Sequence, residues 1–139
     1  MCDYNIWNII FDYCDFKTQI NLLVSFKFLH DKLFITGLYN IDRKYLNKLS
    51  NSILQKDMFG RITKLDASCN PNITDVTQLI SLKILNANYN CGIDQNGIRG
   101  LNLFKFYVDG NTKIKDVSWM KSLKILDTDD NYKILRTRR

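Results

Sequence analysis

A nine-residue pattern of apolar and polar positions recurs four times between Ile62 and Asn131. Each copy begins with an apolar residue, has apolar or small residues at its fourth and sixth positions, and ends with asparagine. The copies are 62–70, 82–90, 103–111 and 123–131, so their closing asparagines are 20, 21 and 20 residues apart. An isoleucine follows each asparagine by three residues, at Ile73, Ile93, Ile114 and Ile134. Such a regular register indicates a repeat architecture.

The alternation inside each copy predicts a short β-strand, because successive side chains of a strand point to opposite faces. Stacking the copies predicts a parallel sheet of about four strands. The return segments are too short for long helices, so we expect extended or 3₁₀ turns on the far side of the sheet. The closing asparagine is expected at the turn, where its amide would bond backbone groups.

Between Tyr4 and Leu33 the apolar residues have helical spacing instead. This spacing predicts short helices over roughly 4–14, 16–24 and 25–34, with Asp15 as the N-cap of the second. Asp42 is expected to cap another helix, and a helical run through Ile53 and Leu54 is expected to end near Gly60.

The predicted class is therefore α+β, in three parts. Residues 1–40 are expected to form a helical module, and residues 41–61 a helical joint that covers the first edge of the stack. Residues 62–139 would hold three full repeats and a partial fourth. A helical module this small must pack against the repeats or a partner, because it cannot bury a sufficient core alone.

The segment Ile6–Lys17 resembles the opening of an F-box, and Ile20–Leu29 is similar to its second half. It departs from the family in lacking the Leu-Pro entry, in having Cys14 where leucine is usual, and in ending on a leucine instead of an aromatic residue. The resemblance implies docking on the Skp-type adaptor of a cullin-RING ubiquitin ligase. The matched positions are Ile6, Ile10, Phe11, Tyr13, Phe16, Ile20, Val24 and Leu29. The alternative is that these side chains only form the interior of a helical cap.

The runs Asn70–Val76 and Asn111–Val117 share an Asn-x-x-Ile-x-Asp-Val phrase that resembles short, internalin-like leucine-rich repeats. The second copy departs from it, since 93–101 holds an extra residue and lacks Asp-Val. The whole layout resembles the F-box and repeat proteins of giant amoeba-infecting DNA viruses, of the mimivirus kind. That resemblance implies a substrate receptor or adaptor-binding subunit of an SCF-type ligase. Two alternatives remain: a plain leucine-rich-repeat binding or scaffold protein with a helical cap, and a decoy that occupies a host adaptor.

The third, fifth, seventh and eighth positions of each copy are expected to project from the concave face of the sheet. The fifth and seventh positions are acidic, polar or tyrosine, although the chain as a whole is basic, and the third positions add Lys64, Lys105, Ile84 and Ile125. We predict that this face binds a basic or polar segment of a protein substrate, with Tyr89 and Tyr107 as anchors. The candidate residues are Asp66, Asn86, Asn88, Tyr89, Tyr107, Asp109, Asp127 and Asp129. The alternative is an ordinary solvated sheet face.

The formal net charge is +6, but the lysines are scattered and the dense basic cluster is Arg136–Arg139 at the end, so we expect no nucleic acid partner. The four cysteines have no CxxC spacing and His30 is the single histidine, which predicts reduced thiols and no metal site. No nucleophile motif or glycine-rich phosphate loop is present. We therefore expect no enzyme activity, catalytic residue or cofactor.

No apolar run approaches the roughly 20 residues needed to cross a bilayer, so we expect no membrane association and a cytoplasmic protein, in the host cytoplasm if the source is viral. The last copy is incomplete after Ile134, which predicts either a truncated chain or an open edge. We expect a monomer, or a weak dimer through that C-terminal edge.

Overall fold

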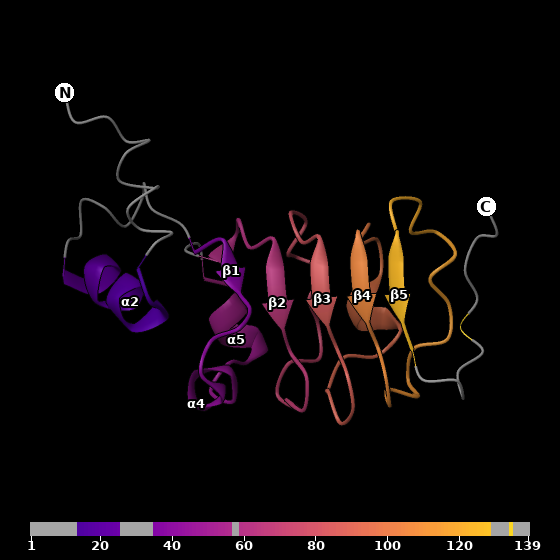
Figure 1. Ribbon diagram of the computed structural model, residues 1–139, viewed down its shortest axis with the longest axis horizontal. Helices are drawn as coiled ribbons and strands as arrows, with labels where there is room; N and C mark the ends of the chain where they lie inside the picture. The colour runs from indigo at the N-terminus through magenta and orange to yellow at the C-terminus, as the bar shows by residue number, and fades with distance from the viewer. Residues whose placement is uncertain (1–13, 26–34, 57–58, 129–133, 135–139) are drawn as a thin grey trace.

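The protein has an α+β fold built on one parallel sheet. The computed structural model describes residues 14–25, 35–56, 59–128 and 134. The elements, in chain order, are α2 (Phe16–Ser25), β1 (Gly37–Leu38), α4 (Arg43–Leu46), α5 (Asn51–Leu54), β2 (Lys64–Asp66), β3 (Ile84–Asn86), the 3₁₀ helix η2 (Asn96–Ile98), β4 (Lys105–Tyr107) and β5 (Ile125–Asp127) (Figure 1). The strands lie side by side in the order β1-β2-β3-β4-β5.

The central residues of the strands are in register across the whole sheet. Leu65 pairs with Leu38 on one side and Leu85 on the other, and the row continues through Phe106 to Leu126. Leu38, Leu65, Leu85 and Phe106 are completely buried, and Leu126 packs partly against the same core. The fourth position of each copy therefore points into the protein, as the pattern predicts.

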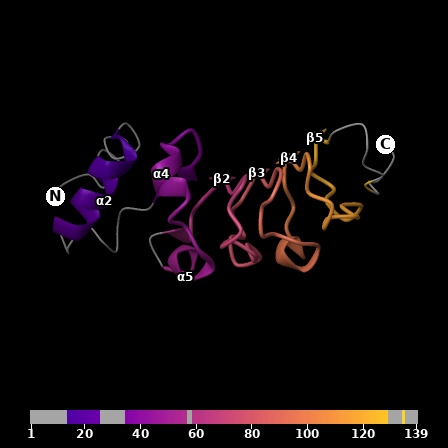
Figure 2. The same cartoon turned by 90° about the horizontal axis from the view of Figure 1, so that it is seen from below.

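The sheet has five described strands, whereas the sequence predicted about four. The additional strand, β1, is only two residues long and precedes the first copy of the pattern, so periodicity gave no signal for it. It pairs with the start of β2, and Ile35 and Leu38 lie in the same core as the repeats. The segment 41–61, expected to cover the first edge, bonds to the first repeat through Leu46, Leu49 and Asn51, and β1 adds a strand at that end of the sheet. Seen from below, the strands β2 to β5 lie along one side of the molecule, and α5 and the orange helical turn η2 lie on the opposite side (Figure 2).

Helices α2 and α4 begin where the sequence predicts. The Asp15 carboxylate accepts a hydrogen bond of 2.8 Å from the Thr18 backbone N–H at the start of α2, and the Asp42 carboxylate accepts one of 3.0 Å from Lys44 at the start of α4. Helix α5 ends at Leu54 instead of near Gly60, because the chain turns there and buries Phe59 in the core. The helices predicted over 4–14 and 25–34 lie outside the described residues, except for Cys14 and Ser25.

The closing asparagines are not equivalent. Asn70 is buried and its amide donates to the carbonyls of Leu46 and Leu49, at 2.9 and 3.0 Å. Asn90 is exposed, and Cys91, one residue later, is completely buried in its place. The prediction that every closing asparagine bonds the turn is therefore wrong at Asn90. The second copy holds the extra residue, and its chain carries a thiol inward there instead of an amide.

The third closing asparagine, Asn111, repeats the pattern of Asn70. Its amide donates to the carbonyls of Ala87 and Ile93, and its oxygen accepts from the Lys113 backbone N–H. The fourth, Asn131, lies outside the described residues. Within the described ranges, no helix combines the length and the apolar composition that crossing a membrane requires.

Candidate protein-binding face

One side of the sheet is free of the helices that lie behind it, and we call this side the open face. It is formed by the residues that flank the buried centre of each strand, which are mostly half-buried or exposed. The row before the centre, the leading row, consists of Gly37, Lys64, Ile84, Lys105 and Ile125. The row after the centre, the trailing row, consists of Tyr39, Asp66, Asn86, Tyr107 and Asp127.

Charge is divided between the two rows. The leading row carries Lys64 and Lys105, and the trailing row carries the carboxylates of Asp66 and Asp127. No ion pair joins these lysines to these carboxylates in the part of the chain that the structure describes. The half of the open face nearer the strand ends is therefore acidic in a protein whose formal net charge is +6.

The seventh positions point toward the turns more than toward solvent. Ser68 is only 4% exposed, and the Arg43 guanidinium of α4 donates to its carbonyl at 2.8 Å and to its hydroxyl at 3.1 Å. The Asn88 side chain accepts a 2.8 Å hydrogen bond from the Asp109 backbone N–H. Asn88 thus stabilises the next turn, although the sequence placed it among the partner-binding residues.

Asp109 differs from its neighbours at the seventh position. Its residue is half-buried, and its Oδ1 atom is buried and has no hydrogen-bond partner among the described residues. Asp129, the corresponding residue of the fourth copy, lies outside the described residues. Of the carboxylates predicted for this face, the structure therefore describes Asp66, Asp109 and Asp127.

Tyr89 lies at the turn after β3 and not in either row. Its backbone is left-handed, with φ of 57°, and 55% of the residue is exposed. Its ring packs against Gly110, where an added Cβ would lie 3.0 Å from Cδ1 of the ring. The sequence predicted Tyr89 and Tyr107 as a pair of anchors. Tyr107 lies in the trailing row, and Tyr89 lies beyond that row, where its backbone N–H donates to the Asp109 carbonyl at 2.6 Å.

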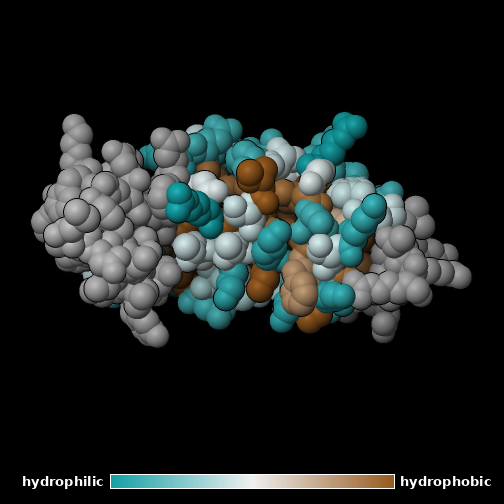
Figure 3. Space-filling view, turned by 90° about the horizontal axis from the view of Figure 1, so that it is seen from above, coloured by the Kyte–Doolittle hydropathy of each residue, from teal (hydrophilic) through white to brown (hydrophobic). Residues whose placement is uncertain are grey.

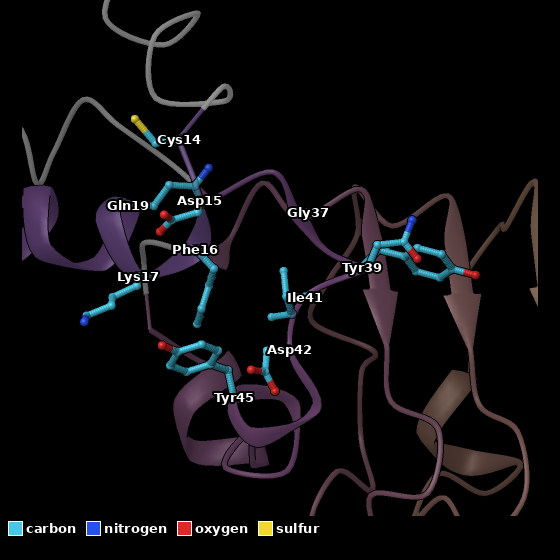
Figure 4. A pocket seen from close by; sticks show the side chains of 11 residues that line it. Cys14, Asp15, Phe16, Lys17, Gln19, Gly37, Tyr39, Ile41, Asp42 and Tyr45 are labelled. Carbon is cyan, nitrogen blue, oxygen red and sulfur yellow. The ribbon is translucent and has the colours of Figure 1, made fainter.

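Tyr39 is a residue of the open face that the sequence did not identify. It follows β1 and lies beside Asp66 in the trailing row, and Figure 4 shows its ring reaching from β1 over the neighbouring strands. Burial raises the pKa of Tyr39, and the nearby Tyr107 and Asp66 raise it further. No signal marked this residue, because β1 lacks the repeat pattern and falls in a segment predicted to be helical.

Two of the predicted adaptor-binding residues face inward. Phe16 and Ile20 on α2 are partly buried against the core, and the Phe16 ring meets Tyr45 edge to face at 5.4 Å between centroids. Val24 lies in α2, but its side chain is not among those described. The remaining members of the set, Ile6, Ile10, Phe11, Tyr13 and Leu29, lie outside the described residues.

Two hollows separate α2 from the first strand and the joint helices. One, of about 480 Å³, includes Tyr39 together with the carboxylates of Asp15 and Asp42 in its lining (Figure 4). Both carboxylates already accept hydrogen bonds from backbone N–H groups at the starts of α2 and α4. The other, of about 240 Å³, is lined mainly by apolar side chains, including Phe16 and Ile20.

Other surface features do not form a chemical centre. Seen from above, apolar side chains show between hydrophilic ones (Figure 3). The exposed large apolar residues of the described ranges include Ile80 at 81% and Phe104 at 42%. Over the described ranges, no three His, Cys, Asp or Glu side chains gather as metal ligands would. No protein-family model, no curated protein and no solved structure matches the chain.

Proposed function

We propose that this chain is an F-box-like and leucine-rich-repeat interaction protein that acts as a substrate receptor of an SCF-type cullin-RING ubiquitin ligase. The observation that carries the proposal is the agreement between the repeated pattern and the sheet. Each of the four copies contributes one short strand, and neighbouring copies pair in register. Stacked units of this kind create an extended surface for binding another protein.

The N-terminal part of the proposal rests on the F-box-like phrase. Helix α2 begins directly after Asp15, where the phrase has its aspartate, and its first residues pack against the joint helices. We assign Phe16 and Ile20 to this internal packing. Contact with a Skp-type adaptor is assigned to the other matched residues, chiefly Ile10 and Phe11.

The second candidate is a plain leucine-rich-repeat binding protein whose helices serve only as a cap. The inward packing of Phe16 and Ile20 favours it, because a cap needs such contacts and an adaptor-binding surface does not. The two candidates share the open face as the surface that binds a protein with a basic or polar segment. They differ in whether the N-terminal segment has a partner.

A pull-down of the full chain with a purified Skp-type adaptor tests the proposal. We expect binding by the unmodified chain and its loss in the double variant Ile10→Glu, Phe11→Ser. Tyr107→Leu, on the open face, is the control and should bind the adaptor normally. Absence of binding by the unmodified chain would leave the plain repeat protein as the better description.

Ubiquitin transfer separates a receptor from a decoy that merely occupies the adaptor. A reconstituted ligase containing the chain should modify a protein captured by the open face. Capture of the adaptor without modification of any bound protein would favour the decoy.

A further inference from the structure

The outer edge of β1 lacks the neighbour that each later strand has on that side. In β3, β4 and β5, the N–H of the leading-row residue donates to the carbonyl just before the preceding strand: Ile84 to Thr63 at 3.0 Å, Lys105 to Lys83 at 3.0 Å and Ile125 to Phe104 at 3.2 Å. Gly37 is the leading-row residue of β1, and β1 is the first strand in the described sheet. The Gly37 N–H therefore points away from the sheet.

The trailing row shows the same relation at the other end of the strands. In β3, β4 and β5, its carbonyls accept from the N–H just after the preceding strand: Asn86 from Ala67 at 2.8 Å, Tyr107 from Ala87 at 2.8 Å and Asp127 from Val108 at 2.9 Å. Tyr39 is the residue of this row that follows β1. Because backbone groups alternate in direction along a strand, Gly37 and Tyr39 both direct their N–H and C=O groups outward. In the described part of the chain, none of these four groups has a hydrogen-bond partner.

The hollow of about 480 Å³ lies beside this edge. Gly37 and Tyr39 line it on one side, and the start of α2, with Phe16 and Lys17, lines it on the other (Figure 4). The Tyr39 ring extends over the neighbouring strands, so it leaves the edge open toward α2 (Figure 4). A strand residue occupies roughly 160 Å³, from a rise of about 3.3 Å, a strand spacing of about 4.8 Å and a sheet spacing of about 10 Å. The hollow therefore has room for about three strand residues, the length of each strand from β2 to β5.

The hollow also contains apolar side chains where the buried row of the sheet would continue. Leu38 is the first member of that row and is completely buried, and Phe16 and Ile41, which line the hollow, pack partly against the same core. A residue paired with Leu38 in an added strand would direct its side chain to the same side of the sheet as Leu38. A large apolar side chain is therefore favoured at that position.

We propose that an extended segment of a partner protein enters this hollow and adds a strand to the outer edge of β1, with a large apolar residue beside Leu38. Unpaired strand edges are templates for pairing, and peptides bind other domains by adding a strand in this way. A second copy of the chain fits less well, because α2 borders the hollow opposite β1 and a folded sheet edge would bring its own neighbouring strands against that helix. The site is separate from the open face, so the inference goes beyond the proposed function.

Selection from a random 12-residue peptide library displayed on phage, with the full chain as bait, supplies peptides for the test. We expect recovered peptides to share a large apolar residue, and its replacement by serine should weaken binding. Only every second N–H of a strand faces its neighbour. Single N-methylation along a selected peptide should therefore weaken binding by about 5-fold or more, the loss of one hydrogen bond, at alternate positions and little between them. The peptide should also shift the backbone amide NMR signals of Gly37 and Tyr39 and leave that of Lys105, in β4, unchanged.

Gly37→Pro and Gly37→Ala are a matched pair of variants. Proline removes the outward N–H, and it is tolerated in edge strands where that N–H faces solvent. Alanine keeps the N–H, and its Cβ would make only an ordinary contact with Lys64. Gly37→Pro should therefore weaken a selected peptide by about 5-fold or more, while Gly37→Ala binds it normally. Thermal unfolding checks that both variants are folded, and if Gly37→Pro unfolds, the methylation pattern and the NMR shifts decide the inference.

Recovery of no peptides, recovery without a shared apolar residue, methylation effects that do not alternate, unchanged Gly37 and Tyr39 signals, or equal binding by the two folded variants would overturn the inference. Self-association that Gly37→Pro abolishes, measured by light scattering over a concentration series, would assign the edge to a second copy and would also overturn it. The adaptor pull-down is independent, because its failure would reject the ubiquitin role and leave this inference standing.

Discussion

Replacing Asn111 by alanine should destabilise the protein strongly, although the same replacement at Asn90 should not. The two residues occupy the same position of the repeated pattern, but Asn111 is 1% exposed whereas Asn90 is exposed. The Asn111 side chain makes three hydrogen bonds of 3.0–3.1 Å, two as donor and one as acceptor. At about 1 kcal/mol for each bond, their loss lowers the free energy of unfolding by roughly 3 kcal/mol.

Urea unfolding followed by circular dichroism measures this difference. For a small protein, roughly 3 kcal/mol corresponds to a fall of about 1–3 M in the urea midpoint. Asn90→Ala should change the free energy of unfolding by less than about 0.5 kcal/mol, as for an ordinary surface substitution. An equal cost at both positions would refute the conclusion that the second copy has replaced its buried amide by a thiol.

A third variant separates the hydrogen bonds from the space that the side chain fills. Asn111→Asp keeps the shape of the side chain but turns both donated bonds into contacts between oxygen atoms. It should therefore be at least as destabilising as Asn111→Ala. A well-tolerated aspartate would show that the alanine variant loses stability through packing, and that the two bonded carbonyls contribute little.

Three further predictions follow from the described residues. Gly92→Ala should destabilise the protein by more than about 1 kcal/mol, because the new Cβ would overlap the carbonyl oxygens of Pro71 and Ile73. Gly37→Ala should cost less, because its Cβ would make only an ordinary contact with Lys64, and urea unfolding compares the two variants. Burial raises the pKa of the Cys91 thiol, so a thiol reagent should modify exposed Cys69 quickly and Cys91 only slowly. Mass spectrometry measures the two modification rates, and equal rates would contradict this prediction. The hydrogen bond from the Thr18 backbone N–H lowers the pKa of Asp15 below 3.8. The stability that this carboxylate contributes is therefore present above its pKa in the unfolded chain and is lost as pH falls through its pKa in the folded protein. A titration midpoint above 3.8, measured by NMR for Asp15, would reject this.

The repeats were largely predictable because their period places one kind of residue on one side of every strand. The apolar fourth positions, from Leu65 to Leu126, identified four of the strands and their parallel stacking. The caps at Asp15 and Asp42 were also predictable, since an aspartate before a helical run bonds the first free N–H groups. The alternation within one copy and the aspartate before a helix are local signals, because each determines the structure of residues only a few positions away.

The remaining features depend on contacts between distant segments. Strand β1 exists because Gly37 and Leu38 pair with β2, some 27 residues later, and a two-residue strand has no period to detect. Tyr39 consequently escaped notice as a residue of the open face. The exposure of Asn90 was likewise hidden, since the pattern assigns it the same position as Asn111 and only packing distinguishes them.

The first strand and the joint helices link the N-terminal helix to the open face. Phe16 on α2 packs against Tyr45 on α4, and Arg43 on the same short helix is bonded to Ser68 at the end of β2. Two residues of one helix thus hold α2 on one side and the sheet on the other, and Tyr39 lies in the segment that leads into that helix. In a substrate receptor, such a connection would fix the orientation of the bound protein relative to the adaptor, which a flexible linker cannot do. Arg43→Ala removes the bonds to Ser68 while leaving Phe16 and Tyr45 in place. It should therefore impair ubiquitin transfer more than it impairs binding of either the adaptor or a basic peptide.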